Sequence, residues 1–160
     1  MISIGSFGPA DFETIKTLVE SIQEFERTYV PELKLGVEIG AAYTEKLVNT
    51  IANQQGVIFL AKTDTDTVGF VCAWIDEDDD LLLSEDARTH AYISDIFVSE
   101  DWRRQGVATL LLQAVETEMR QRGCQRIRIC TKAANLSALT CYKANGYSAY
   151  EIVLSKRLTG

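Results

Sequence analysis

The sequence predicts one mixed α/β (α+β) domain that spans residues 1–160. Helical and strand periodicities alternate in the order β-α-α-β-β-β-α-β-α-β, which combines six strands with four helices. No internal repeat or Pro/Ser-rich linker interrupts this order. A chain of 160 residues is also within the usual size of one compact domain, so we expect a single domain.

The first third of the chain predicts a short strand followed by two helices. Residues 1–6 have strand character, and Pro9 suits the first turn of the next helix, where its missing N–H costs no hydrogen bond. Apolar residues then recur at helical spacing, and a connection containing Pro31 separates this helix from the next. The second amphipathic helix is predicted where apolar side chains recur every four residues, at Ile39, Tyr43, Leu47 and Ile51.

The middle of the chain predicts three strands. The runs GVIFLAK and TVGFVCAWI are rich in β-branched and aromatic residues and flank the turn-forming residues 64–67, so we expect an antiparallel hairpin. The third strand is expected to end in the acidic segment 76–86. Strand character resumes in residues 90–98, which predict the fourth strand.

The last third predicts a long helix, a strand, a short helix and a final strand. Residues 105–122 place Val107, Leu111, Val115 and Met119 on one helical face, and Gly123 suits the C-terminal cap. A fifth strand is expected at residues 126–129, a short helix at 135–145, and a sixth strand at 147–158.

Composition and charge argue against several function classes. No apolar run approaches the roughly 20 residues that cross a bilayer, and no signal peptide is recognisable, so we expect a cytoplasmic protein without a membrane partner. The net charge of −7 disfavours nucleic acid as a partner and favours a cationic small substrate. The cysteines form no C-x-x-C pair and no cluster with histidine, so we expect reduced thiols and no metal site.

The junction between the fourth strand and the long helix predicts an anion site. Its sequence, DIFVSEDWRRQGVATLLLQAVE, places a short basic, glycine-containing loop before the helix. The first N–H groups of a helix have no internal partner and carry partial positive charge, so they suit a phosphate. Gly106 permits close approach to the backbone, Ala108 is small, and Arg103 and Arg104 add charge.

Two other phosphate-binding loops are absent from the sequence. Neither G-x-G-x-x-G nor G-x-x-x-x-G-K-[ST] occurs, which argues against dinucleotide-dependent hydride transfer and nucleotide hydrolysis. On its own, R-x-x-G-x-A is also compatible with a tight turn before a helix.

Two spaced motifs resemble the GNAT superfamily of N-acetyltransferases. The first is [RQ]-x-x-G-x-[GA] after a strand, matched by Arg103, Gly106 and Ala108. The second is an Asn, an Ala three residues later, a Tyr four beyond it and then Gly with an aromatic residue; it is matched by Asn135, Ala138, Tyr142, Gly146 and Tyr147. The resemblance implies a mostly antiparallel sheet of about six to seven strands with about four flanking helices. It also implies transfer of an acetyl group from acetyl-CoA to an amine.

The resemblance assigns most of the cofactor site residue by residue. The fourth strand would diverge from the fifth and pair its backbone with the pantetheine arm at Ile96, Phe97 and Val98. The loop and the first helical turn would hold the pyrophosphate through the residues Arg103, Arg104, Gln105, Gly106, Val107, Ala108 and Thr109. Asn135 would contact the cofactor arm. Tyr142 would lie near the thioester sulfur and protonate the departing thiolate.

The proton acceptor is less clearly marked in the sequence. Many members of the family carry a Glu on the fourth strand, where this chain has Ser94 and Asp95. We therefore expect the base to be Asp95, or a water chain held by Ser94 and Tyr92. His90 is expected to be solvated at the start of its strand.

The implied chemistry is direct attack of a neutral amine on the thioester, without a covalent enzyme intermediate. Cys141 has no visible activating base and is expected to be a packed thiol. The acceptor is expected to be a small cationic amine or a peptide amine. The acidic residues Asp76 to Asp80 are either an electrostatic attractor for it or a solvated loop.

Two alternative functions would use the same phosphate-binding loop. One is a non-catalytic acyl-CoA sensor, favoured by the unusual Ser94, and the other is a transferase for a longer acyl-CoA. A homodimer is also possible, because members of the family often pair through their C-terminal strands.

Overall fold

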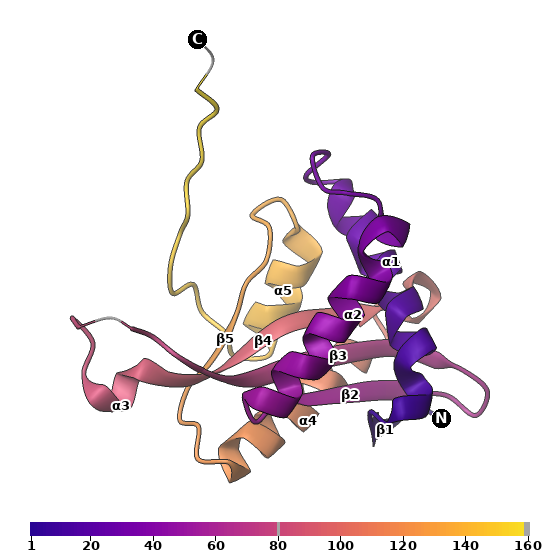
Figure 1. The fold of residues 1–160 in the computed structure, drawn as a ribbon, viewed down its shortest axis with the longest axis horizontal. Coiled ribbons are helices and arrows are strands. Elements are labelled where there is room, and N and C mark those ends of the chain that lie inside the picture. The colour runs from indigo at the N-terminus through magenta and orange to yellow at the C-terminus, as the bar shows by residue number, and fades with distance from the viewer. Residues whose placement is uncertain (80, 159–160) are drawn as a thin grey trace.

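The computed structural model describes residues 1–79 and 81–158. These residues form a five-stranded sheet in the order β1-β2-β3-β4-β5 (Figure 1). The first three pairings are antiparallel and β4 pairs with β5 in parallel, so the expected mostly antiparallel, mixed sheet is confirmed. The strands are β1 (Ser3–Ser6), β2 (Val57–Lys62), β3 (Thr67–Glu77), β4 (Thr89–Val98) and β5 (Ile127–Ile129).

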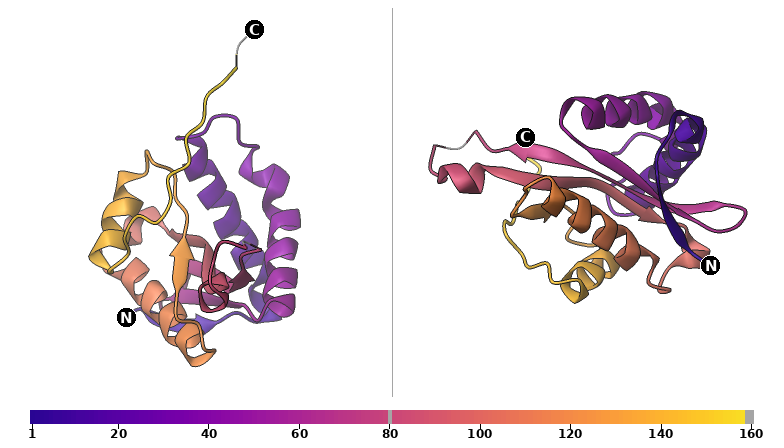
Figure 2. Two further views of the ribbon diagram at one scale, coloured as in Figure 1. Left: turned by 90° about the vertical axis from the view of Figure 1, so that its left-hand side faces the viewer. Right: turned by 90° about the horizontal axis from the view of Figure 1, so that it is seen from below.

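The helices lie in the connections and cover both faces of the sheet. In the described part of the chain they are α1 (Phe12–Arg27), α2 (Gly36–Asn53), α3 (Glu85–Arg88), α4 (Val107–Gln121) and α5 (Leu136–Ala144), with 3-10 turns at Pro9–Asp11 and Glu100–Trp102. The right-hand view of Figure 2 shows α1 and α2 on one face and α4 and α5 on the other. None of the described helices is long and apolar enough to cross a membrane.

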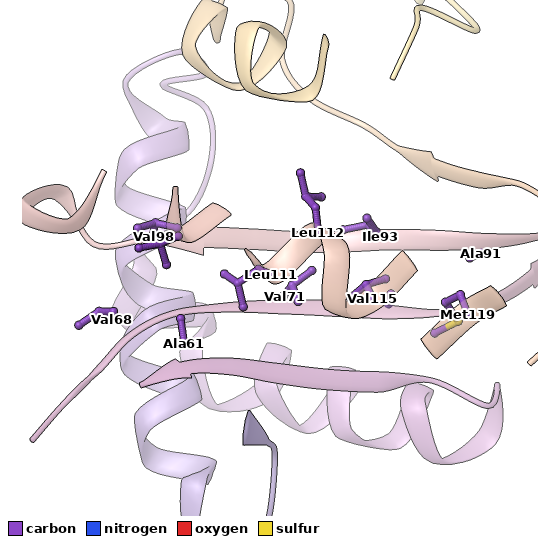
Figure 3. Close-up of a cluster of buried hydrophobic side chains, with 12 residues drawn as sticks. Ala61, Val68, Val71, Ala91, Ile93, Val98, Leu111, Leu112, Val115 and Met119 are labelled. Atoms are coloured by element: carbon purple, nitrogen blue, oxygen red, sulfur yellow. The ribbon is translucent and has the colours of Figure 1, made fainter. Parts of the chain in front are cut away.

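Two apolar clusters fill the spaces between the sheet and these helices. On one face, Leu111 and Val115 of α4 pack with Ile93 of β4 and the alternate residues of β2 and β3 (Figure 3). On the other face, Ile15 of α1 and Leu47 of α2 pack against Phe70 and its neighbours. Successive side chains of β3 point to opposite faces of the sheet, and helices cover both faces. Both sets of side chains are therefore buried, which explains why TVGFVCAWI is an almost unbroken apolar run.

A β-bulge interrupts β4 near its middle. Cys72 of β3 pairs with Asp95 and the next residue, Ala73, pairs with Ile93, so Ser94 is an extra residue without a pairing partner on β3. Such a bulge reverses the alternation of side chains along the strand. As a result Ile93 faces α4, whereas Asp95 faces α1 and α2.

The pairing of β4 with β5 ends just before this bulge. The parallel ladder joins Ala91 to Ile127 and Ile93 to Ile129, after which β5 ends and β4 continues to Val98. Beyond Ile93, β4 therefore has a ladder partner only on its β3 side among the described residues. The divergence of the two strands, expected from the resemblance, is present.

The sixth strand expected at residues 147–158 is absent. Residues 148–158 have no regular secondary structure and extend from the body of the molecule (Figure 1). The sequence of this segment suits a strand, but a strand forms only when its backbone groups are paired. The sheet therefore has one strand fewer than the six assigned from the sequence.

Two further expectations were wrong. His90 is not solvated but only 2% exposed, because it pairs with Asp76 inside the β3–β4 ribbon and lies 3.1 Å from the Arg88 carbonyl. The acidic segment after β3 also contains an additional short helix, α3, so the described residues hold five α-helices rather than the expected four.

The packing of α4 predicts a strong contrast between two adjacent leucines. Leu111 is fully buried between α4 and the sheet, whereas Leu110 is 40% exposed on the same helix. We expect Leu111→Ala to lower the free energy of unfolding by about 2–5 kcal/mol through lost burial and a cavity. Leu110→Ala should cost less than about 1 kcal/mol. Urea unfolding followed by circular dichroism measures both, and equal losses would contradict this packing.

Candidate functional site

The open edge of β4 leads directly into the loop before α4. Ile96, Phe97 and Val98 pair with β3 on one side and have no β5 partner on the other. Their free edge therefore offers backbone groups to an extended ligand, as an edge strand does to an added strand.

The loop that follows turns its backbone into a shape suited to an anion. Arg104 has φ of 60° and Gly106 has φ of 81°, so two of three consecutive residues are in the left-handed region. Gly106 is the N-cap of α4, and no side chain caps the first N–H groups of this helix. Alternation of left-handed and other conformations groups successive N–H donors into an anion-binding concavity. These donors join the positive end of α4.

The space in front of Gly106 is open. A methyl group added there would meet no protein atom within 4 Å, so neighbouring protein atoms do not impose the glycine. The positive φ favours glycine, and the open space leaves room for a ligand against the backbone. The loop and the first turn of α4 therefore fit a phosphate group.

The residues of this segment differ in what their side chains do. Arg104 and Gln105 are exposed, with Gln105 Nε2 donating to the Asp101 carbonyl at 2.7 Å. Arg103 instead donates from Nε to the Val98 carbonyl at 3.0 Å, and its guanidinium lies 4.6 Å from the Phe25 ring. The side chain of Arg103 therefore ties the loop to β4 and α1 instead of extending freely into solvent.

The first turn of α4 is also held in place by its contacts with the core and with α5. Val107 is buried in the core, Ala108 is half-buried, and the Thr109 hydroxyl accepts a hydrogen bond from Asn145 Nδ2 at 3.2 Å. The last contact joins α4 to the end of α5. The N-terminus of α4 is thus held in place before any ligand arrives.

Asn135 and Tyr142 lie at the two ends of α5. Asn135 is the N-cap, and its Oδ1 accepts a hydrogen bond from the Ala138 N–H at 3.1 Å. This bond is the usual role of asparagine at a helix start. Tyr142 is half-buried beside Tyr147, with ring centroids 6.1 Å apart. Burial, Cys141 and then Glu26 raise the pKa of Tyr142, which keeps its hydroxyl protonated.

Asp95 is the buried carboxyl group at the bulge. It is 8% exposed, and the Tyr43 hydroxyl of α2 donates to it at 3.2 Å from Oδ1 and 3.1 Å from Oδ2. Burial is the largest effect and raises the pKa of Asp95, while hydrogen bonds from Ser94 and Tyr43 oppose the shift. A carboxyl group with a raised pKa is better matched to accept a proton near neutral pH.

Glu26 and Tyr43 were not expected in the site. Burial is the main cause of the raised pKa of both Asp95 and Tyr142, and Glu26, in the last turn of α1, adds a smaller increase to each. Tyr43 was expected only as one apolar position of its helix. The sequence held one signal for this role: Tyr43 is the only hydroxyl-bearing residue in an apolar repeat that is otherwise aliphatic. A buried tyrosine hydroxyl normally has a hydrogen-bond partner, so a partner could have been expected.

The remaining sequence candidates occupy different positions. Ser94 is the bulged residue, with its Oγ 3.4 Å from the Cys72 carbonyl. The Tyr92 ring packs on Trp74, with centroids 5.6 Å apart, and burial raises the pKa of Tyr92 to about 12. Cys141 is half-buried within reach of Asn145, and burial raises the pKa of its thiol, as expected for a packed cysteine.

The acidic segment is partly neutralised by its own contacts. Asp78 forms an ion pair with Arg128 of β5, at 2.6 Å. Asp76 and Glu77 end β3, Asp79 is exposed, and Asp80 lies outside the described residues. No group of three or more histidine, cysteine or acidic side chains in residues 1–79 and 81–158 is placed to hold a metal ion.

Comparisons with known proteins identify the family of this chain. Residues 19–147 match the model of the acetyltransferase (GNAT) family. The chain is 27% identical over 115 residues to aminoglycoside N(6')-acetyltransferase type 1 of Stenotrophomonas maltophilia, covering 71% of this chain and 74% of that protein. It is 33% identical over 69 residues to N-alpha-acetyltransferase 30 of Schizosaccharomyces pombe, covering 43% of this chain and 46% of that protein.

A solved structure supports the fold over the whole chain. The structure of AAC(6')-Iy in complex with the bisubstrate analogue CoA-S-monomethyl-acetylneamine superposes with a TM-score of 0.73, covering 100% of this chain and 99% of that one. Because the sequence identity is only 21%, this similarity concerns the fold alone. The family match covers most of the chain and includes the loop before α4. The chain therefore belongs to the acetyltransferase (GNAT) family and is an N-acetyltransferase.

Proposed function

We propose that this protein transfers the acetyl group of acetyl-CoA to a primary amine of a small cationic acceptor. One observation carries the proposal: the unpaired edge of β4 runs straight into the left-handed loop and the uncapped N-terminus of α4. This arrangement offers an extended arm a row of backbone partners and offers a phosphate a positive helix end.

The cofactor would be held by backbone groups more than by side chains. The amide portions of pantetheine would pair along Ile96–Val98, and the pyrophosphate would accept from the N–H groups of residues 104–109. Because the Val98 carbonyl already accepts from Arg103, the hydrogen bonds to pantetheine fall on the other free groups of this edge. Arg104 is the exposed cation nearest in sequence to these donors.

The reaction needs one bond to form and one to break. The lone pair of the neutral amine attacks the thioester carbonyl carbon, and the C–S bond then breaks as the C–N bond is kept. The ammonium proton passes to Asp95, directly or through water at Ser94. Tyr142 donates its proton to the departing thiolate, so the products are an acetamide and the free thiol.

Burial prepares both proton-transfer groups for these roles. The raised pKa of Asp95 makes its carboxylate a stronger base than an exposed aspartate. The raised pKa of Tyr142 keeps its hydroxyl protonated, so the proton is still present when the thiolate departs. Asp95 faces the layer of α1 and α2, whereas Tyr142 belongs to α5 on the other face of the sheet (Figure 2).

The acceptor is proposed to be a polycationic amine of the aminoglycoside type. The S. maltophilia relative is named for acetylation of an aminoglycoside N(6') amine, and the bisubstrate analogue in AAC(6')-Iy joins CoA to acetylneamine. The net charge of −7 and the carboxylates of Glu26 and Asp95 suit a cationic amine. An amine at a peptide N-terminus is the second candidate, favoured by the match to N-alpha-acetyltransferase 30.

Two glycines provide a matched test of cofactor binding. Gly106 begins α4 with φ of 81° and Gly123 follows its end with φ of 90°, and both face open space. Alanine at either position costs about 1 kcal/mol of backbone strain. By calorimetric titration we expect Gly106→Ala to bind acetyl-CoA at least about 10-fold more weakly, because the added methyl group meets the ligand, whereas Gly123→Ala should bind normally.

The same protein then receives an amine panel with acetyl-CoA. Rapid acetylation of an aminoglycoside supports the proposed acceptor, whereas preference for a peptide N-terminus selects the second candidate. Tight binding of acetyl-CoA without turnover on any amine would indicate an acyl-CoA sensor. Equal affinities of the two glycine variants would contradict the proposed cofactor site.

Asp95 and Tyr43 are tested by their pH profiles. With one acceptor, whose own ionisation is constant, kcat of the wild type should fall as Asp95 becomes protonated on the acidic side. Tyr43→Phe removes a hydrogen bond that lowers the pKa of Asp95, so the acidic limb should move to higher pH. Asp95→Asn should lose about 10²-fold in kcat and lack this limb. A limb that persists in Asp95→Asn would assign it to another group.

Tyr142 is tested against its neighbour. Tyr142→Phe should lower kcat by about 10²-fold with little change in acetyl-CoA affinity, because only the proton donor is removed. Tyr147→Phe is the control, since the Tyr147 hydroxyl lies in the same aromatic pair but donates to Glu116 at 2.9 Å. Steady-state kinetics compare the two variants, and equal effects on kcat would rule out the acid role of Tyr142.

A further inference from the structure

Helix α5, which carries Tyr142, is only partly embedded in the core. None of its residues is fully buried, whereas α4 buries a continuous apolar face against the sheet. Cys141 and Tyr142 are half-buried and pack against the apolar cluster that α4 shares with the sheet. Because core packing fixes α5 less firmly than α4, its polar contacts matter more for its position.

Two side-chain hydrogen bonds between described residues join the C-terminal end of α5 to α4. Asn145 Nδ2 donates to Thr109 Oγ1 at 3.2 Å, and the Tyr147 hydroxyl donates to Glu116 Oε1 at 2.9 Å. Thr109 is the third residue of α4 and belongs to the turn proposed to hold the pyrophosphate. Glu116 lies about two turns farther along the helix. Of these two bonds, the one from Asn145 therefore reaches the proposed cofactor segment.

Asn145 also holds the turn of α5 that contains Tyr142. Its backbone N–H lies 3.1 Å from the Cys141 carbonyl and 3.0 Å from the Tyr142 carbonyl, and its Nδ2 donates to the Cys141 carbonyl at 2.9 Å. The side-chain amide of asparagine has two N–H donors, so one can serve this turn while the other serves Thr109. A residue that only ended α5 would need no hydrogen bond across to α4.

We propose that Asn145 is a positioning residue, which fixes the Tyr142 hydroxyl relative to the phosphate-binding turn of α4 through its hydrogen bond with Thr109. The pyrophosphate and the sulfur of acetyl-CoA are joined by the pantetheine arm, so an acid that serves the sulfur must keep a set distance from the phosphate site. Such an acid acts only within hydrogen-bond reach, and small displacements are costly. The inference rests on the proposed acid role of Tyr142.

Thr109 supplies the other half of this link. Its hydroxyl accepts from Asn145 and therefore retains its own proton, which can be donated to a ligand oxygen. The backbone N–H of Thr109 is also among the first of α4, which have no acceptor within the helix. One residue thus belongs to the proposed phosphate site and contacts the helix that carries the acid. Binding energy at the phosphate is then available to set the geometry of the reacting end.

Thr109→Val tests the link, because it removes the hydroxyl and retains the β-branched shape. Thr140→Val is the matched control, since the exposed Thr140 hydroxyl donates to the Leu136 carbonyl within α5 itself, at 2.8 Å. With saturating acetyl-CoA and the amine that is acetylated fastest in the panel above, Thr109→Val should lower kcat about 10-fold. Thr140→Val should retain the wild-type kcat. Thr109→Ser, which keeps the hydroxyl, should retain most of it.

Asn145→Ala breaks the same hydrogen bond from the other side. Its kcat should fall by at least the factor seen in Thr109→Val. Adding Thr109→Val to Asn145→Ala should then cause less than about a 2-fold further loss, because the bond is already absent. Two independent losses that multiply in the double variant would overturn the proposed link.

A second pair of variants separates positioning of the acid from a general loss of structure. Tyr142→Phe lacks the hydroxyl that Asn145 is proposed to position, so adding Thr109→Val to it should change kcat by less than about 2-fold. A structural defect would instead lower kcat by the same factor with and without the Tyr142 hydroxyl, and that outcome would overturn the inference. A wild-type kcat in Thr109→Val would overturn it as well.

These kinetics distinguish failure of the inference from failure of the proposed function. If Tyr142→Phe retains the wild-type kcat, or if no amine in the panel is acetylated, Tyr142 has no acid role and the inference falls with it. If Tyr142→Phe loses about 10²-fold in kcat while Thr109→Val loses nothing, the acid role stands and only the link through Asn145 is refuted.

Discussion

The structure depends on how far β4 is paired on each of its edges. On the β3 side the ladder continues to the end of β4, so the strand is rigid and its position is fixed by the core. On the β5 side the ladder stops at Ile93. The second half of β4 is therefore held firmly from one side and left open on the other, which is what an enzyme needs to bind an extended cofactor against a preorganised surface.

The bulge at Ser94 determines which face of the sheet the Asp95 side chain lies on. Without the extra residue, Ile93 and Asp95 would share one face of the sheet, and Asp95 would face the core around α4. With it, the carboxyl group turns toward Tyr43 and lies on the face covered by α1 and α2. Burial of that carboxyl costs stability, and hydrogen bonds from Tyr43 and Ser94 offset part of the cost. The proposed proton acceptor and the proposed cofactor edge are therefore consecutive residues in the second half of β4.

Local patterns predicted most elements but not their long-range pairing. The apolar repeats of α2 and α4 are local signals, and both helices lie close to where the sequence placed them. The bulge was not predicted because a single extra residue leaves the composition of the strand unchanged. The partnership of Tyr43 with Asp95 joins residues 52 positions apart, which no local period records. The final strand was predicted from its period-two pattern, but residues 148–158 pair with no strand of the described chain.

In the candidate site, too, local sequence patterns marked some residues and missed others. The loop before α4 was marked by its sequence because close approach to a backbone requires small residues at fixed spacing. Glu26 was not marked, since one glutamate in the last turn of an amphipathic helix is unremarkable in sequence. Its effect on Asp95 and Tyr142 appears only when α1 is placed over the end of β4.

The most direct test of this account is hydrogen exchange of the protein with and without acetyl-CoA. If the open edge of β4 and the N-terminus of α4 hold the cofactor, amides within residues 96–98 and 104–109 should gain protection on binding. The amides of β1, at the opposite edge of the sheet, should not change. Protection confined to other segments, or no change at saturating acetyl-CoA, would contradict the central claim that this strand and loop form the cofactor site.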